Sequence, residues 1–341
     1  MTVKKNIQSA IGLISQKVSL KLLMDLSGQK LIMPFYHTVS NGYLPHISAL
    51  YKPKTSREFE NDLDFFLKYY NPVCLDDLKT GVALKSKKPV FFLSFDDGLK
   101  ESKSIIAPIL KRKGIPATFF VNSAFIDNRS LFFRYKTSLL VDAFQNKKKL
   151  KSAKKDICEI LNVPNTDNNK IVSAILNLKY HQQKIINELA IILEVDFIEY
   201  LKTAQPYLSS EEIKKLQNEG FSIGAHSIDH PEFRFIPLEE QLRQTKESLL
   251  FVRQNFMPDI LSFSFPFTDY AVEKLFFSKL KNMDICDLSF ACAGLKHDSI
   301  SDHFQRIPME DERGTAEQAI KFEYFYFILK SVIAKNNISR E

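Results

Sequence analysis

The sequence of 341 residues predicts an α/β protein of parallel strand–helix units, interrupted by a helical insertion. Two observations predict this class. Short apolar runs of strand length alternate with helical patterns, as parallel βα units require. One long stretch, residues 135–205, is helical and polar and contains no strand candidate. The composition of 45% hydrophobic and 26% charged residues, with Gly 10 and Pro 14, excludes disordered and collagen-like chains.

Apolar runs of four to six residues mark the expected strands, and the last of them is the weakest. They are Leu31–Tyr36, Val90–Phe95, Ala117–Val121, Phe221–Ala225, Leu261–Phe265, Leu288–Ala291 and His303–Ile307.

Helix start and stop signals lie between these runs. Thr55 with Glu58, and Ser209 with Glu212, form capping-box patterns at two helix starts. A further helix is expected over Lys100–Lys113, because Gly114 is a typical stop signal. Another helix is expected to start at Pro237 and to run through Val252.

These patterns divide the chain into four parts. We expect an N-terminal helical segment over residues 1–30, a barrel over 31–134 and 206–310, a helical insertion and possible lid over 135–205, and a C-terminal helix over 311–341. The insertion contains a lysine-rich run, Lys147–Lys155, which we interpret as a solvated surface, with an anionic partner as the alternative. The net charge of +7 is not accompanied by a nucleic-acid reading motif, so no nucleic-acid partner is expected.

The N-terminus and the cysteines indicate a cytoplasmic protein. Polar residues interrupt the segment after Lys4 and Lys5, so no signal peptide is expected, and no apolar run is long enough to span a membrane. The segment favours an amphipathic helix packed on the body, while a membrane-surface helix is the alternative. The cysteines show no metal-site or disulfide spacing and are expected as free thiols, at Cys74, Cys158, Cys286 and Cys292.

Two adjacent carboxylates end the second predicted strand. Asp96 and Asp97 follow the apolar run and precede Gly98. At the carboxyl end of a parallel strand, such side chains meet those of other strands. One carboxylate could then bind a metal while the other faces the substrate. The alternative is a structural Asp-Gly turn that closes the strand.

Two histidines at ligand spacing follow the fourth predicted strand. His226 and His230 are four residues apart and can reach a common point. Imidazole is a standard zinc ligand, and two histidines with one carboxylate leave coordination positions open for water and substrate. A pair of surface histidines is the alternative interpretation.

Together these segments resemble a known family. The motifs SFDDG (94–98), ILKRKGIPATFFV (109–121) and EEIKKLQNEGFSIGAHSIDHP (211–231) are similar to the polysaccharide deacetylases of carbohydrate esterase family 4, which share the nodulation-factor deacetylase homology domain. The resemblance covers about residues 31–309 apart from the insertion. It implies a distorted (β/α)7 barrel. The Tyr36-His37 pair resembles the exopolysaccharide-type branch of the family.

The resemblance implies a role for each motif residue. Asp97, His226 and His230 would be the metal ligands, and Asp96 would be the base that deprotonates the attacking water. The backbone N–H of Phe267 would help to hold the oxyanion. Ser264 stands where the family has an arginine that orients the catalytic aspartate, and Arg306 is a substitute suggested by its position.

The general acid is the least certain role, because the family's late Leu-x-His motif has no clear match. His297 and His303 are candidates by position, although His303 is as readily interpreted as a surface residue. His37 at a strand end is an alternative near the site, and a packing role for it is the rival interpretation.

The function implied is removal of N-acetyl groups from amino sugars of a bacterial polysaccharide or its precursor. The cofactor expected is a divalent metal, with zinc most consistent with the ligands and cobalt, nickel or iron also compatible. The partner expected is an N-acetylated oligo- or polysaccharide, and the sequence does not indicate an oligomeric state. Rival functions are an inactive glycan-binding relative and a hydrolase of another non-peptide C–N bond.

Overall fold

The structure is a computed structural model that describes residues 2–146, 153–164, 167–310 and 313–340. Its centre is a parallel sheet with the strand order β11-β9-β8-β7-β6-β5-β2-β12. In chain order these strands are β2 (Pro34–Tyr36), β5 (Ser94–Phe95), β6 (Thr118–Val121), β7 (Ser222–Ala225), β8 (Ser262–Ser264), β9 (Leu288–Ala291), β11 (His303–Gln305) and β12 (Ile307–Pro308).

The two edge strands of this sheet belong to one stretch of chain. β11 and β12 are separated by Arg306 alone, and they pair in parallel with β9 and β2 respectively. The segment that contains β11 and β12 therefore bridges both edges and closes the sheet into a barrel. The (β/α)7 barrel with a helical insertion, predicted from the sequence, is confirmed.

A second, three-stranded parallel sheet continues the barrel. It has the order β1-β4-β3, with β1 at Leu31–Ile32, β4 at Val90–Phe92 and β3 at Asn71–Val73. The predicted strands 31–36 and 90–95 are each divided in two, because their first halves pair with each other and β4 also pairs with β3, while their second halves join the barrel. The short β3, which includes Pro72, was not predicted.

Helices surround the barrel. They are α3 (Ser56–Tyr69), α4 (Leu75–Lys79), α5 (Ala107–Lys113), α11 (Ser210–Asn218), α12 (Leu238–Phe256) and α13 (Lys274–Asn282), and capping boxes form at Thr55 and Ser209. Of these, α3, α11 and α12 begin where the sequence predicts, whereas α4 and α13 were not predicted. The helix predicted over 100–113 begins instead as a π-helix, Ser102–Ile106, before α5. Short 3₁₀ turns occur at Val82–Lys85, Ile126–Asn128, Tyr180–Gln182 and Phe233–Phe235.

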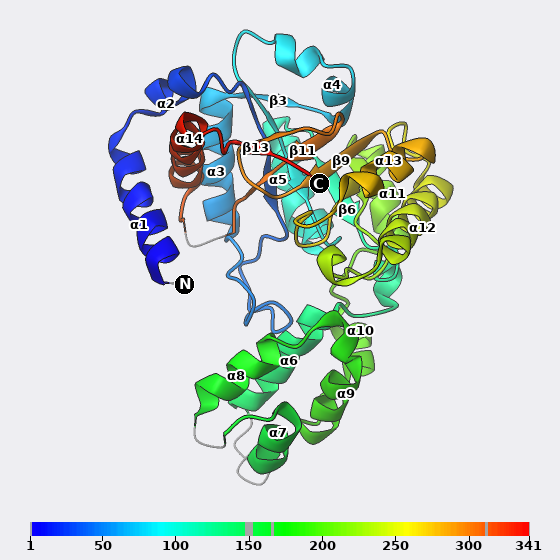
Figure 1. The fold of residues 1–341 in the computed structure, drawn as a ribbon. Helices are drawn as coiled ribbons and strands as arrows, with labels where there is room; N and C mark the ends of the chain where they lie inside the picture. The colour runs from blue at the N-terminus through cyan, green and yellow to red at the C-terminus, as the bar shows by residue number, and fades with distance from the viewer. Residues whose placement is uncertain (1, 147–152, 165–166, 311–312, 341) are drawn as a thin grey trace.

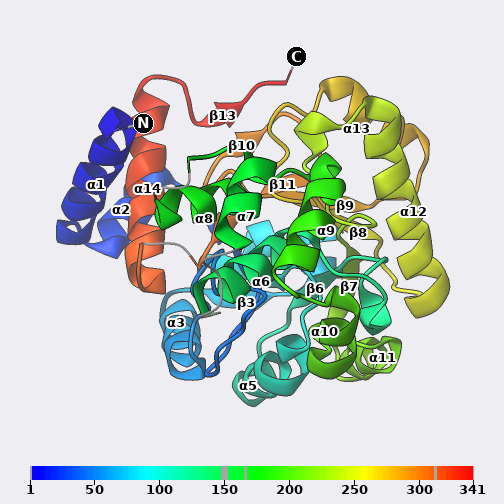
Figure 2. The same cartoon turned by 90° about the horizontal axis from the view of Figure 1, so that it is seen from below.

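The insertion is helical and lies at one end of the barrel. Its helices are α6 (Phe133–Asn146), α7 (Ala153–Leu161), α8 (Asn168–Leu176), α9 (Gln183–Ile192) and α10 (Phe197–Ala204). They project from the barrel in Figure 1 and lie in front of its strands when seen from below in Figure 2. They have an apolar cluster of their own, which includes Leu140, Ile175 and Leu189. Residues 147–152 of the lysine-rich run lie outside the described residues.

Helices near the two ends of the chain pack together on one flank of the barrel. α1 (Thr2–Lys17) and α2 (Leu20–Ser27) lie against α14 (Ala316–Val332), as Figure 1 shows. The helix predicted over 311–341 is limited to α14. A strand follows it, because β13 (Asn337–Ile338) pairs with β10 (His297–Asp298). Among the described residues, no helix has the length and apolar character needed to cross a membrane.

Candidate metal centre

Asp96 and Asp97 stand at the carboxyl end of β5. The Asp96 N–H still donates to the Tyr36 carbonyl at 3.0 Å, so the strand pairing continues to this point. The chain then turns sharply, with φ of 71° at Asp97 and 64° at Gly98. A Cβ at Gly98 would lie 3.0 Å from the Val121 side chain. Both the backbone angle and the available space therefore favour glycine after the two carboxylates.

His226 and His230 stand at the carboxyl end of β7, two strands away from β5 in the sheet. The His226 N–H donates to the Val121 carbonyl at 2.9 Å, and the His230 N–H donates to the Ser227 hydroxyl at 3.1 Å. The turn between them has φ of 67° at Ser227 and 63° at His230. This tight turn brings the two Nε2 atoms to 3.1 Å from each other.

Asp97 faces both imidazoles with a single oxygen. Its Oδ1 lies 3.3 Å from His230 Nε2 and 3.6 Å from His226 Nε2. All three side chains are buried, and Oδ1 has no hydrogen-bond partner among the described residues. A buried carboxylate oxygen without a donor is costly, so this atom is suited to bind a cation. The donor set fits a divalent metal such as zinc.

The protonation of the imidazoles suits metal binding. His226 Nδ1 lies 2.8 Å from the Ser264 carbonyl, which can only accept, so Nδ1 carries the hydrogen and Nε2 has the lone pair. Burial lowers the pKa of His226 to about 4 and that of His230 to about 3. Both rings are therefore neutral at neutral pH, the form in which imidazole coordinates metal.

Asp96 is held by Arg306, the residue between β11 and β12. The guanidinium donates to Oδ1 at 2.8 Å and to Oδ2 at 2.7 Å, and it also donates to the hydroxyls of Ser94 and Ser264. Burial alone would raise the pKa of Asp96, but the charge of Arg306 outweighs it and holds that pKa well below its usual range. Arg306 thus occupies the place suggested for it by sequence position, while Ser264 provides a second contact to Asp96 at 3.3 Å.

Phe267 lies in a strained loop after β8. Its φ is 56°, and the Thr268 N–H donates to the Pro266 carbonyl at 2.6 Å, which defines a tight three-residue turn around Phe267. The Phe267 ring packs 4.6 Å from that of His230. Among the described residues its own N–H has no hydrogen-bond acceptor. A strained turn beside a cluster of buried polar groups is typical of a functional site.

His37 follows β2 and is held by Glu310, just beyond β12. One Glu310 oxygen lies 2.5 Å from His37 Nδ1 and also accepts the backbone N–H of His37 at 2.8 Å. The other oxygen accepts the backbone N–H of Thr38 at 2.8 Å. Burial lowers the pKa of His37, but the charge and hydrogen bond of Glu310 outweigh it, and the pKa rises to about 9. The charges of Asp97 and Asp96 also raise it, so the His37 ring is protonated at neutral pH.

The two late histidines that the sequence offered as candidates make other contacts. His297 is exposed and packs on Phe327. His303 is not a surface residue: it is buried, and its ring lies 2.8 Å from the Ser289 hydroxyl and 3.0 Å from Asp269. It belongs to a separate cluster with Asp269 and Asp298, whose carboxylates are already neutralised by the Arg340 guanidinium.

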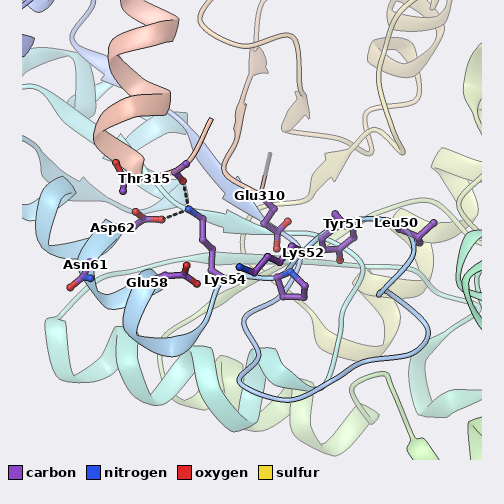
Figure 3. Close-up of a pocket in the computed structure, with 11 residues that line it drawn as sticks. Leu50, Tyr51, Lys52, Lys54, Glu58, Asn61, Asp62, Glu310 and Thr315 are labelled. Atoms are coloured by element: carbon purple, nitrogen blue, oxygen red, sulfur yellow. Dashed lines mark hydrogen bonds and ion pairs between the residues drawn. The ribbon is translucent and has the colours of Figure 1, made fainter. Parts of the chain in front are cut away.

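A cavity of about 780 Å³ lies beside the His37–Glu310 pair (Figure 3). Residues 50–54, α3 and the start of α14 form its walls, and Lys54 crosses it to pair with Asp62. Glu310 and Tyr51 line this cavity, and both also contact His37. None of the three residues Asp97, His226 and His230 lines this cavity, so it lies next to their cluster rather than within it.

A closed parallel barrel with buried polar side chains at the carboxyl ends of its strands is the arrangement of barrel enzymes. The family model described as polysaccharide deacetylase matches residues 83–284, which is more than half of the sequence. The chain belongs to the polysaccharide deacetylase family, whose members act as hydrolases.

Solved structures agree with this fold. The Streptococcus pyogenes deacetylase PplD in complex with acetate has a TM-score of 0.54 at 12% identity, over 86% of this chain and 98% of that one. IcaB from Ammonifex degensii has a TM-score of 0.53 at 14% identity, over 87% and 98%. At these identities the likeness shows the fold alone. No curated protein sequence matches the chain.

The structure brings together most of the residues singled out in the sequence. Asp97, His226 and His230 meet in one cluster, with Asp96 3.9 Å from His226. The Phe267 loop borders the same cluster. Two further residues that contact these groups, Tyr135 and Glu310, were not identified from sequence. Neither lies in a recognisable motif. Each is brought to the site by the packing of its own segment, α6 for Tyr135 and the residues just after β12 for Glu310.

Proposed function

We propose that this protein is a metal-dependent deacetylase that removes N-acetyl groups from amino sugars of a bacterial polysaccharide or its precursor. The observation that carries the proposal is the buried, unpartnered Asp97 Oδ1 facing two neutral imidazoles. Asp97, His226 and His230 would hold the ion, with zinc the best match to two nitrogens and one oxygen. The Tyr36-His37 pair supports placement in the exopolysaccharide-type branch.

Each remaining residue has a role that its surroundings support. A divalent cation would supply a Lewis acid that acidifies a water molecule and polarises the acetyl carbonyl. Asp96, ionised and fixed by Arg306, accepts the proton of the attacking water. The free N–H of Phe267 donates to the oxygen that becomes negative. His37, protonated beside Glu310, donates the proton that the leaving amine needs.

The inactive-relative alternative loses its main support. That alternative rested on the arginine missing near position 264, where this chain has serine, and on the lack of a clear general acid. Arg306 reaches the same carboxylate from its position between β11 and β12, with both terminal nitrogens bonded to Asp96. The aspartate is therefore oriented although the third motif lacks its arginine.

The experiment that tests the proposal is acetate release from a panel of N-acetylated amino-sugar oligomers. Zinc, cobalt, nickel or iron is added to metal-free protein, and metal content is measured in parallel. We expect activity only with metal, and we expect His226→Ala and His230→Ala to lose both metal and activity while staying folded. A His226→Ala protein with full metal content and full turnover would refute the assignment. Release of ammonia or another amine product without acetate would favour hydrolysis of a different C–N bond.

A further inference from the structure

The first helix of the insertion brings a tyrosine into contact with Asp97. The Tyr135 hydroxyl donates a 2.7 Å hydrogen bond to Asp97 Oδ2, and both side chains are buried. The two oxygens of this carboxylate are therefore in different surroundings. Oδ2 is held by Tyr135, whereas Oδ1 has no donor and faces the imidazoles.

Aromatic packing fixes the position of the Tyr135 ring. It lies edge-on to Phe132 at 5.0 Å and to His46 at 5.1 Å, and it stacks on Tyr207 at 6.1 Å. The Tyr207 hydroxyl accepts the backbone N–H of Phe132 at 3.0 Å, so two of the rings that pack on Tyr135 are also joined by a hydrogen bond. A phenol hydroxyl carries its proton at neutral pH and the Asp97 carboxylate can only accept, so Tyr135 is the donor in this hydrogen bond.

The insertion and the residues just before it also approach the neighbouring ligand candidate, His230. The Phe132 ring, just before α6, lies 4.3 Å from the His230 ring. The Tyr180 hydroxyl, between α8 and α9, donates to Asp229 at 2.6 Å, one residue before His230. Contacts from the insertion therefore reach both the β5 and the β7 sides of the cluster.

We propose that Tyr135 is a positioning residue of the metal centre, whose hydroxyl holds Asp97 so that Oδ1 alone is presented to the ion. This inference rests on the proposed function, in which Asp97, His226 and His230 bind a divalent cation. A hydrogen bond to a ligating carboxylate fixes its orientation before the metal arrives, and its loss typically weakens metal affinity about 10–100-fold. The helical insertion is then a part of the metal centre as well as a cover for it.

The test is titration of metal-free protein with zinc alone and with cobalt alone, comparing wild type with Tyr135→Phe. Tyr70→Phe is the matched control, because Tyr70 is also buried and its hydroxyl bonds that of Tyr324 rather than a residue of the cluster. We expect Tyr135→Phe to bind both metals about 10–100-fold more weakly and Tyr70→Phe to bind as wild type does. Tyr135→Phe keeps the aromatic ring and its packing on Phe132 and Tyr207, so the variant should remain folded, as circular dichroism will show.

The cobalt absorption spectrum at saturating metal gives a second readout. Without the hydroxyl, Asp97 is free to offer both oxygens, so the visible bands of the cobalt-loaded Tyr135→Phe protein should differ from those of wild type. Unchanged affinity together with an unchanged spectrum would overturn the role of Tyr135 and leave the metal centre intact. Failure of the wild-type protein to bind either metal would instead overturn the proposed function.

Discussion

Asp96 and Asp97 are adjacent in the sequence, yet their surroundings assign them different chemistry. Asp96 is bonded through both oxygens to Arg306, so its charge is compensated within the protein. Asp97 accepts one hydrogen bond from Tyr135 and leaves the other oxygen free. Two neighbouring carboxylates with distinct partners commonly divide the tasks of base and ligand.

Replacing Asp96 by asparagine separates these tasks. We expect Asp96→Asn to retain the metal, since Arg306 already occupies both oxygens, and to lose about 10²–10⁴ in turnover, the usual contribution of a general base. Metal content and acetate release measured on the same preparation check this. Loss of the metal together with activity would make Asp96 a ligand, and unchanged turnover would remove it from the reaction.

His37 should make stability depend on pH in alkaline solution. Its pKa is about 9 in the folded protein and about 6.5 in an unfolded chain, so folding favours the protonated ring. The stability contributed by the His37–Glu310 pair is complete below about pH 6.5 and is lost as the pH rises through about 9.

The measurement is urea unfolding of metal-free protein across this pH range. Wild type should lose more free energy of unfolding between about pH 6.5 and about pH 9 than His37→Gln does. The exposed His297, substituted in the same way, serves as the control and should follow wild type. Identical pH profiles for wild type and His37→Gln would show that folding does not raise the pKa of His37.

At the scale of elements, apolar runs located the barrel strands well, because a strand buried on both faces must be apolar throughout. The run over 303–307 was the weakest because Arg306 interrupts it, yet that arginine is fully buried inside the barrel. The π-helix over Ser102–Ile106 and the break at Leu93 have no local signal. They depend on packing between elements distant in the chain.

The short strand β13 ties the end of the described chain to the loop that carries Phe267. Arg340 follows β13, and its guanidinium donates to Asp269 and Asp298 and to the Val272 carbonyl at 3.3 Å. Because the Arg340 side chain is only 4% exposed, Arg340→Ala leaves two buried carboxylates without their cation. We expect it to lower the free energy of unfolding by about 3–5 kcal/mol, measured by denaturant titration.

An exposed arginine provides the comparison for Arg340. Arg243 pairs with Glu240 and Glu247 on the surface of α12, so Arg243→Ala should cost no more than about 1 kcal/mol. If Arg340→Ala were as mild as Arg243→Ala, the cluster around Asp269 would be stable without its arginine.

At the scale of the whole molecule, the sequence revealed the motifs but not how the insertion meets them. Asp97 and His226 could be assigned to one site because both follow predicted parallel strands, whose carboxyl ends converge. Tyr135 stands 38 residues after Asp97 in a helix, and nothing in its local sequence marks it. Its contact depends on how the whole insertion packs against the barrel.

Metal binding should stabilise the folded chain as a whole, because the three ligand candidates come together only when β5 and β7 are paired into the barrel. A ligand that binds only the folded state adds about 2.7 kcal/mol at a concentration of 100 times its dissociation constant. Zinc should therefore raise the unfolding midpoint of metal-free wild type. His226→Ala should show no such increase, whereas Asp96→Asn should respond as wild type does. An equal increase in His226→Ala would place the stabilising ion elsewhere, and no increase in wild type would mean that the cluster binds no zinc.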